Sequence, residues 1–160
     1  MDTLAIFDCH ISALEGQRLE SGEYLVLPFD QRQKARHRVR LESGREIGIQ
    51  LPRGTVLRNG DLLKSSTGEL VNVVAAAEAV STATSDDAML LARAAYHLGN
   101  RHVHLQVGNG WLRYLHDHVL DHMVESLGLS VSEGVLPFEP EAGAYRHGHE
   151  HWCLSPLADD

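Results

Sequence analysis

The chain has little of several features that would assign its class at once. It holds two cysteines in 160 residues, Cys9 and Cys153, and they form no CxxC pair. They provide no disulfide framework, and two free thiols fit a reducing compartment, so we expect a cytoplasmic protein. No apolar run approaches the roughly 18 residues that a membrane-spanning helix needs, so we expect no membrane contact. The acidic start of the chain, with Asp2, argues against a secretory signal.

Positive charge is scarce in the second half of the chain. Residues 1–68 carry ten Lys or Arg and nine Asp or Glu, whereas residues 69–160 carry four and thirteen, together with nine of the eleven histidines. A surface with this excess of negative charge repels phosphate, so we expect no nucleic-acid binding. The composition break near residue 70 predicts two domains, 1–70 and 71–140, followed by a tail at 141–160.

The first 70 residues have the pattern of a small all-β domain. Turn signals such as Asn59-Gly60 separate short apolar runs at close intervals. The run 31–41 is predicted to be one strand with its cations on one face, a basic strand at 32–40. These cations are Arg32, Lys34, Arg36, Arg38 and Arg40. The basic face is either a solvated face of an antiparallel sheet or a docking surface for an acidic protein partner. A single stripe without interleaved aromatic residues is a poor nucleic-acid footprint.

The second domain is predicted to alternate strands and helices. Ser85, Asp86 and Asp87 supply N-cap chemistry for a helix, and Gly99-Asn100 supplies its end. The predicted elements are, in order, a strand at 69–77, a helix at 88–98, strands at 102–107 and 111–115, a helix ended by Gly128, and a strand at 130–138. The order βαββαβ predicts an α+β protein whose second domain is a ferredoxin-like sandwich. The Pro-, Gly- and His-bearing tail is predicted to be flexible.

The hairpin between the two central strands of this domain sets which histidines meet. A two-residue turn at Asn109-Gly110 pairs Gly108 with Trp111. Continued along both strands, this register places His102 opposite Asp117. The histidines on either side of Asp117 are His116 and His118. The sequence therefore predicts that the hairpin gathers histidines from both of its strands.

The open face of the same hairpin predicts a homodimer. Trp111 and Leu115 are expected to lie on that face, where large apolar side chains are costly to leave in water. Burial against a second copy of the chain is the simplest way to cover them. A twofold contact of this kind would place each His102 near its symmetry mate.

The candidate metal ligands of this chain are histidines. Two imidazoles across a dimer axis make an incomplete metal site, and the tail offers further donors at His147, His149 and His151. A donor set rich in imidazole and poor in thiolate suits Ni(II), and also Zn(II) or Cu(II) in vitro. A second candidate pair, His118 and His122, has i,i+4 spacing but lacks the glutamate of an HExxH motif.

Two other classes of function stay open at this stage. One is a metal-dependent hydrolase that uses His116, His118 and Asp117; the other is a structural adaptor whose histidines are incidental. A catalytic site would favour rigid ligands with an open water position and a nearby general base. The sequence offers no nucleophile motif, no P-loop and no paired acid and base in a pocket-forming context, so we expect no enzyme.

Three motifs together resemble the signature of a known family. They are Gly99-Asn100-Arg101-His102, His116-Asp117-His118-Val119-Leu120-Asp121, and Leu136-Pro137-Phe138-Glu139-Pro140-Glu141-Ala142-Gly143-Ala144-Tyr145. The N-terminal stretches RQKARHRVRL and LPRGTVLRNGD are similar to the β domain of the same family. Over essentially its whole length the chain resembles UreE, the family of urease accessory nickel metallochaperones.

The resemblance implies a function, an assembly and a ligand set. The function would be delivery of Ni(II) for assembly of the urease active site, with the urease accessory GTPase, other accessory proteins and apo-urease as partners. The assembly would be a homodimer built on the second domain, with the first domain making protein contacts. His102 would hold nickel at the dimer axis. His116 and His118 match a second, peripheral pair, the tail histidines would add coordination, and His104 and His122 lie outside the matched positions.

Overall fold

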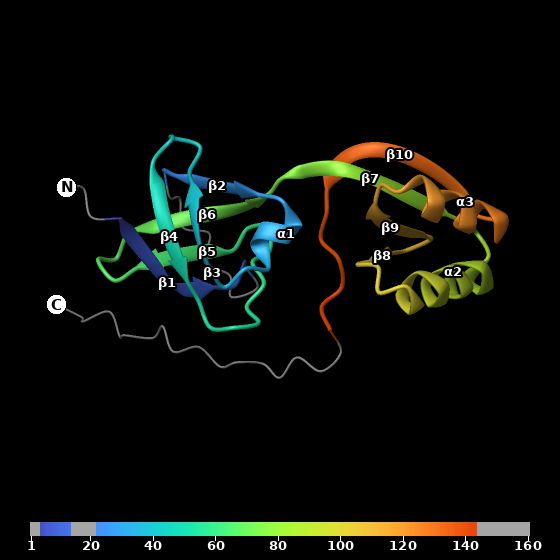
Figure 1. Ribbon diagram of the computed structural model, residues 1–160, viewed down its shortest axis with the longest axis horizontal. Helices are drawn as coiled ribbons and strands as arrows, with labels where there is room; N and C mark the ends of the chain where they lie inside the picture. The colour runs from blue at the N-terminus through green and yellow to red at the C-terminus, as the bar shows by residue number, and fades with distance from the viewer. Residues whose placement is uncertain (1–3, 14–21, 144–160) are drawn as a thin grey trace. The chain divides into compact units, whose positions relative to one another are not determined.

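The computed structural model describes residues 4–13 and 22–143, so the predicted tail ligands His147, His149 and His151 lie outside the described residues. The chain divides into two compact units, and the second begins at Ala76 (Figure 1). It is a mixed α+β protein with more strands than helices. In the described part of the chain, no helix is long and apolar enough to cross a membrane.

The described residues of unit 1 form a six-stranded sheet with one short helix. Its elements are β1 (Ala5–Ile11), β2 (Tyr24–Leu27), α1 (Phe29–Arg32), β3 (Arg36–Arg40), β4 (Glu46–Gln50), β5 (Leu62–Ser65) and β6 (Leu70–Ala75). The strand order is β2-β6-β5-β1-β4-β3, which leaves β2 and β3 at the edges. Branched apolar side chains such as Ile47, Leu63 and Val71 are fully buried and form the core.

The predicted basic strand begins later than expected, because Arg32 is a core residue. Residues Phe29–Arg32 form α1, and the Arg32 guanidinium donates from Nε to Leu27 O at 3.1 Å and from Nη1 to Leu57 O at 3.0 Å. Those two carbonyls and the Phe29 ring, whose centroid lies 5.5 Å from the guanidinium carbon, contact a cation that is completely buried. Arg32 is therefore not part of the basic face, and that part of the prediction was wrong. The alternation holds within Arg36–Arg40, where the arginines are exposed and Val39 is buried.

The central strand β1 was not predicted. It pairs with β4 in parallel and with β5 in antiparallel fashion, so its position depends on partners far along the chain. Cys9 in this strand is disulfide-bonded, so the prediction of a free thiol at this position was wrong. Cys153 lies outside the described residues.

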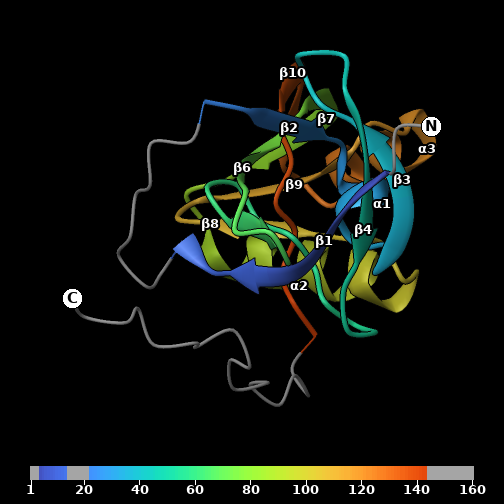
Figure 2. The same ribbon diagram turned by 90° about the vertical axis from the view of Figure 1, so that its left-hand side faces the viewer.

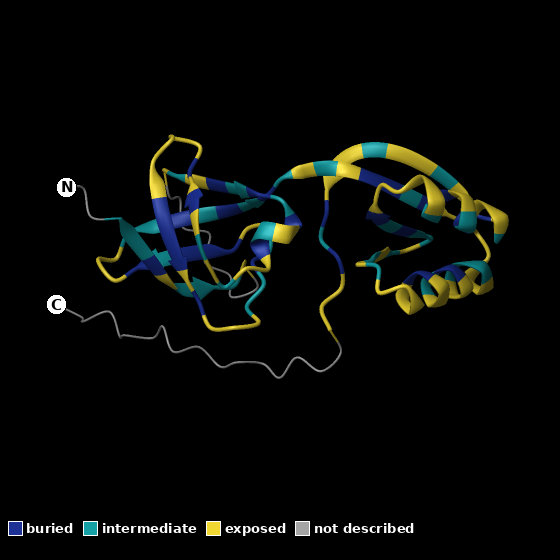
Figure 3. Cartoon of the chain, viewed as in Figure 1, coloured by how far each residue is buried: buried dark blue, intermediate teal, exposed yellow. Residues whose placement is uncertain are grey.

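Unit 2 is a four-stranded antiparallel sheet with two helices on one face. Its elements are β7 (Ala77–Thr84), α2 (Ala88–Asn100), β8 (Gln106–Gly108), β9 (Trp111–Leu115), α3 (His118–Ser126) and β10 (Ser130–Pro137). The strand order is β10-β7-β9-β8. Leu98 and Val124 from the helices pack with Leu112 and Tyr114 from β9. Figure 3 shows exposed residues on the outer turns of both helices and buried residues beneath them.

Side-chain caps explain where the helices of unit 2 begin. The Asp87 carboxylate accepts a hydrogen bond from Met89 N–H at 2.8 Å at the start of α2. The Asp117 carboxylate accepts one from Val119 N–H at 2.8 Å at the start of α3. Each bond satisfies one backbone donor that has no partner inside the helix. Gly128, with φ of +106°, ends α3 as predicted.

The first strand of unit 2 lies later in the sequence than predicted. The predicted strand 69–77 is β6 (Leu70–Ala75), which pairs with β2 and β5 in unit 1. The true first strand is β7, whose sequence AEAVSTAT has few large apolar residues. It is nevertheless central, because β9 and β10 pair with it on either side.

The chain after β10 passes from one edge of the sheet of unit 2 to the other. The N–H of Glu139 donates to the Gln106 side-chain oxygen at 3.0 Å, and the N–H of Glu141 donates to Leu105 O at 2.8 Å. Because β10 and β8 are opposite edges, these bonds fasten the end of the described chain beside β8.

Candidate metal site

His102 lies in the turn that closes α2. Its backbone has φ of +59°, and its N–H donates to Gly99 O at 2.9 Å. The N–H of the next residue, Val103, donates to Leu98 O at 3.2 Å. This bond pair is the common way to close a helix, with one left-handed residue just beyond its end. The His102 side chain is exposed, so its imidazole is presented to solvent from a fixed backbone.

The predicted hairpin register is confirmed near the turn but does not extend to His102. Gly108 pairs with Trp111, as predicted, and Val107 pairs with Leu112. The strand starts only at Gln106, because α2 continues to Asn100 and the residues after it form the closing turn. His102 is therefore not on a strand and does not pair with Asp117, which corrects the prediction.

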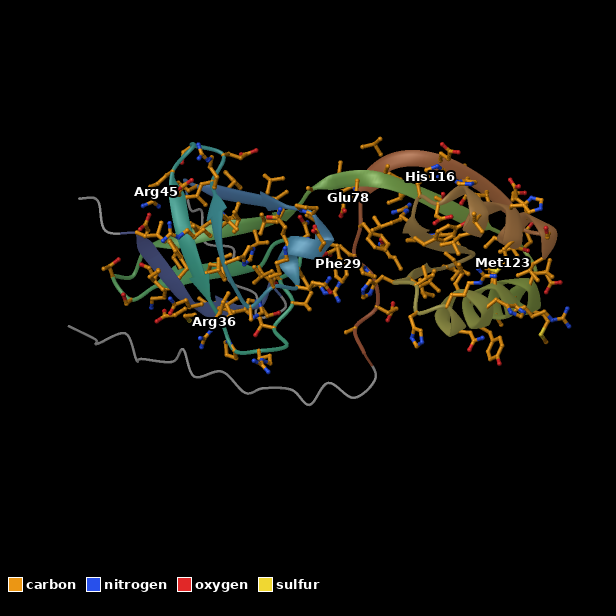
Figure 4. The ribbon with its side chains drawn as sticks, in the orientation of Figure 1. Phe29, Arg36, Arg45, Glu78, His116 and Met123 are labelled. Atoms are coloured by element: carbon orange, nitrogen blue, oxygen red, sulfur yellow. The ribbon has the colours of Figure 1, made fainter. Side chains whose placement is uncertain are left out.

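His116, the residue after β9, is the centre of a polar cluster in unit 2 (Figure 4). Its Nδ1 lies 3.1 Å from Asp121 Oδ2 and 3.0 Å from Ser81 Oγ. Its Nε2 lies 3.9 Å from Glu133 Oε1. One ligand atom from each of His116, Asp121 and Glu133 lies within 4.8 Å of the other two. The three come from the end of β9, from α3 and from β10, so the cluster forms only when α3 packs on the sheet.

Asp121 orients the imidazole of His116. Its Oδ1 accepts a hydrogen bond from the Tyr114 hydroxyl at 2.8 Å, and its Oδ2 faces His116 Nδ1. Burial, and after it the bond to Asp121, raises the pKa of Tyr114 far above its ordinary value, so the phenol keeps its proton. A proton on Nδ1 would face Asp121 Oδ2 and Ser81 Oγ, and Nε2 would then carry the free lone pair on the side of Glu133. A carboxylate in this position orients metal-binding imidazoles in many proteins.

His118, the other member of the predicted peripheral pair, is exposed at the first residue of α3. Between it and His116, the Asp117 carboxylate accepts hydrogen bonds from the backbone of Leu120 and Val119, and these donors lower the Asp117 pKa. Within residues 4–13 and 22–143, the cluster around His116 includes neither His118 nor the secondary candidates, which are His104 and His122.

Two members of the cluster were missed from the sequence. Asp121 was not among the predicted site residues, but it is only 9% exposed because Tyr114 and His116 lie against it. Glu133 belongs to the cluster because it pairs with Ser81 on the neighbouring strand. The signal for Asp121 was its place one turn after the cap residue Asp117, on the side of α3 that meets the sheet. Glu133 had no local signal, since its position depends on the β7–β10 register.

Comparison with known proteins covers both units. Residues 10–76 match the family domain described as UreE urease accessory protein, N-terminal domain, and residues 78–155 match the C-terminal domain of the same family. The chain is 60% identical over 121 residues to the urease accessory protein UreE of Alkalilimnicola ehrlichii, covering 76% of this chain and 74% of that protein. It is 57% identical over 134 residues to the UreE of Vibrio parahaemolyticus, covering 79% of this chain and 84% of that protein. It is 53% identical over 143 residues to the UreE of Teredinibacter turnerae, covering 89% of this chain and 92% of that protein.

These matches define a two-domain, metal-handling urease accessory protein that is not an enzyme. The chain belongs to the UreE family. Its role is that of a nickel metallochaperone in urease maturation, where it acts with the other maturation components. The family, the function and the absence of catalysis predicted from the sequence are confirmed, and the metal-dependent hydrolase is set aside.

Proposed function

We propose that this chain carries Ni(II) as cargo in a site shared by two copies of the chain and passes it to the urease accessory GTPase and, through it, to apo-urease. His102 from each copy supplies the shared ligands. His116 and His118 belong to a second, peripheral site, and the tail histidines His147, His149 and His151 add donors. The observation that carries this proposal is the exposed imidazole of His102 on the rigid closing turn of α2.

The surroundings of His102 support a shared site. Its ring is exposed, and within the described ranges no hydrogen bond or ion pair occupies either ring nitrogen. One imidazole offers a single donor, whereas Ni(II) in proteins takes four or more of the nitrogen and oxygen type. A twofold axis at this turn would double the imidazoles without a second motif in the sequence.

Exposed apolar side chains support dimerisation through unit 2, the metal-binding and dimerisation domain of the proposal. Val135 is 70% exposed and Val119 is 54% exposed. Large apolar surface of this kind is favourable to cover with a second subunit. The ferredoxin-like description of this unit is supported by the βαββαβ order and by a sheet in which β7 and β9 are central.

The cluster around His116 supports a weaker, peripheral site. His116 Nε2 and the largely exposed carboxylate of Glu133 can share an ion from solvent, while Asp121 keeps the ring oriented. Exposed His118 is separated from His116 by only one residue. Zn(II) and Cu(II), which bind imidazole as readily as Ni(II), are expected to occupy this site in vitro.

Delivery requires release as well as capture. Ligands divided between two subunits and a tail can leave the metal one at a time, so a partner can replace them stepwise. The bonds from Glu139 and Glu141 to β8 support the tail's part in this, because they fix where the tail begins on unit 2. We place this exchange in the cytoplasm, with unit 1 acting in contacts to partner proteins.

Calorimetric titration with Ni(II) tests the binding site. We expect the tight phase to disappear in His102→Ala and to persist in His97→Ala, which removes the exposed histidine of α2. Neutral imidazole is the ligand, so binding should weaken as the pH falls. Tight binding retained in His102→Ala, or affinity that does not change between about pH 8 and about pH 5, would overturn the assignment.

Activation of apo-urease tests the handover. Wild-type chain loaded with nickel, together with the accessory GTPase, should activate apo-urease beyond the level given by the same total nickel added free. His102→Ala should give only the level of free nickel, whereas His97→Ala should match the wild type. Full activation by His102→Ala would exclude this residue from delivery.

A further inference from the structure

Strand β3 forms a free edge of the sheet in unit 1. It is last in the strand order β2-β6-β5-β1-β4-β3 and, among the strands of the described residues, pairs with β4 alone (Figures 1 and 2). An edge strand presents one row of backbone N–H and C=O groups that a further strand can bond.

The β3–β4 register shows which backbone groups face the free edge. The N–H of Leu51 donates to Ala35 O at 2.7 Å, and the N–H of Leu41 donates to Arg45 O at 2.9 Å. Hydrogen-bonded positions alternate along an antiparallel pair, so the odd-numbered residues of β3 bond to β4. The backbone groups that point to the free edge belong to Arg36, Arg38 and Arg40.

The same three residues place positive charge along the edge. All three side chains are exposed. Arg40 donates to Glu46 at 2.8 Å, whereas Arg36 and Arg38 form no ion pair with any residue in the described ranges. Figure 4 labels Arg36 at the rim of unit 1. Backbone donors and uncompensated cations therefore occur together on one edge.

A hollow continues this surface beyond the first residue of β3. Its volume is about 490 Å³, and it is lined by residues 33–36, Leu51, Arg53 and Gly54. Three cations, Lys34, Arg36 and Arg53, contribute to the lining, and no acidic residue does. The hollow is therefore suited to a carboxylate.

Protection against aggregation is the simplest explanation for arginines on an edge strand. It accounts for charge along β3 itself. It does not account for Lys34 and Arg53, which lie off the strand around the hollow and have no acidic partner in the part of the chain that the structure describes. Positive charge that continues from the edge into a hollow indicates a ligand of negative charge.

We propose that an acidic, extended segment of a partner protein adds to β3 as a further strand. Its carboxylates would face Arg36 and Arg38, and one more would enter the hollow between Lys34 and Arg53. Backbone hydrogen bonds supply affinity in this mode of recognition, and the charges select the segment. The proposal deepens the partner contacts assigned to unit 1 and does not depend on where nickel binds.

Fluorescence anisotropy with labelled peptides tests this surface on the full chain. The probe is fluorescein-labelled (Glu-Thr)5, which can form an extended strand with its acids on one face. We expect Arg38→Glu to bind the probe roughly tenfold more weakly. The matched variant Arg93→Glu, an exposed charge reversal on α2, should bind it as the wild type does. Nickel binding measured on both variants should be unchanged, which separates this test from that of the metal site.

Two further probes distinguish strand addition from charge attraction. (Glu-Thr)5 methylated on every backbone nitrogen has the same charge but no backbone N–H, so it should bind much more weakly than unmethylated (Glu-Thr)5. (Lys-Thr)5 should not bind. Equal binding of both acidic peptides, or unchanged binding by Arg38→Glu, would overturn the proposal. So would single-stranded DNA that binds through Arg38 more tightly than the acidic peptide. If Arg38→Glu loses its β-sheet circular dichroism, Arg38→Gln replaces it, with a smaller loss of affinity expected.

Discussion

The backbone N–H of His102 donates to the carbonyl oxygen of Gly99 at 2.9 Å, which closes α2 with a histidine in the left-handed region. Among the described residues it is the only non-glycine residue with positive φ. Glycine is the residue most often found at this position of a helix-closing turn. The proposed nickel ligand therefore occupies a place where the backbone favours a residue without a side chain.

Replacing His102 with glycine should separate stability from metal binding. Relief of the left-handed strain should stabilise unit 2 by about 1 kcal/mol, since this conformation costs a non-glycine residue about 1–2 kcal/mol. The same change removes the imidazole, so tight nickel binding should be lost. Urea unfolding and calorimetric titration measure the two effects, and His102→Ala, which keeps the strain, is the control. A His102→Gly chain less stable than His102→Ala would contradict this account of the turn.

Removing the Tyr114 hydroxyl should weaken both the core of unit 2 and its peripheral metal site. In Tyr114→Phe the buried Asp121 loses the donor to Oδ1, and an unsatisfied buried polar group costs about 1–3 kcal/mol. The loosened carboxylate should also orient His116 less well. Chemical unfolding measures the first effect, and Cu(II) titration in the His102→Ala background measures the second. Tyr96→Phe, at a residue that is 69% exposed, should change neither.

Gly108 is required by the side chain of Trp111. A Cβ at position 108 would lie 2.0 Å from Trp111 Cε2, so the indole in Gly108→Ala must leave its place. The indole also lies 4.6 Å beneath the Arg113 guanidinium, and that contact would be lost with it. We expect destabilisation of about 1–3 kcal/mol and a changed tryptophan emission, read in a Trp152→Phe background. Gly99→Ala, where a Cβ meets nothing within 4 Å, should instead leave unit 2 as stable as before or more so.

His37 should make unit 1 less stable in mild acid. Both of its ring nitrogens are buried and have no hydrogen-bond partner among the described residues. Burial, and after it the charge of Lys34, lowers the pKa of His37, while Asp30 opposes the shift. The unfolded chain therefore takes up a proton on His37 at a higher pH than the folded chain does. Stability should fall as the pH decreases from about 7 through the unfolded value of about 6.5 towards the lower folded value.

Thermal unfolding at several pH values tests this dependence. The unfolding temperature of His37→Leu should exceed that of the wild type by more as the pH falls. The difference should become constant below the pKa of His37 in the folded chain. His97→Leu, in unit 2, is the matched control, and its unfolding temperature should change with pH as that of the wild type does. A constant difference between His37→Leu and the wild type across this range would show that His37 does not titrate on unfolding.

Local signals were sufficient to predict the elements of unit 2 that carry the family motifs. The cap at Asp87, the turn at Asn109-Gly110 and the glycine at 128 each fix a boundary through a few neighbouring residues. Strand β7 was missed because its alanines and Glu78 belong to residue types that are depleted in strands, and Val80 is its only large apolar residue. Its central place comes from pairing with β9 and β10.

The candidate site was predictable only in part for the same reason. Exposed histidines can be found by residue type and motif, and His102 and His116 were found in this way. The partners of His116 depend on tertiary packing: Asp121 is buried by its bond to Tyr114, and Glu133 is positioned by its pairing with Ser81. The placement of His102 was wrong because the closing turn of α2 extended into residues that alternate like a strand.

Native mass spectrometry of the nickel-loaded chain tests the central claim, a shared nickel site, most directly. The shared site predicts a dimer that retains one tightly bound nickel ion for every two chains, and a His102→Ala dimer that retains none at the same nickel concentration. One tightly bound nickel ion on each isolated chain, or retention of the ion by His102→Ala, would contradict it.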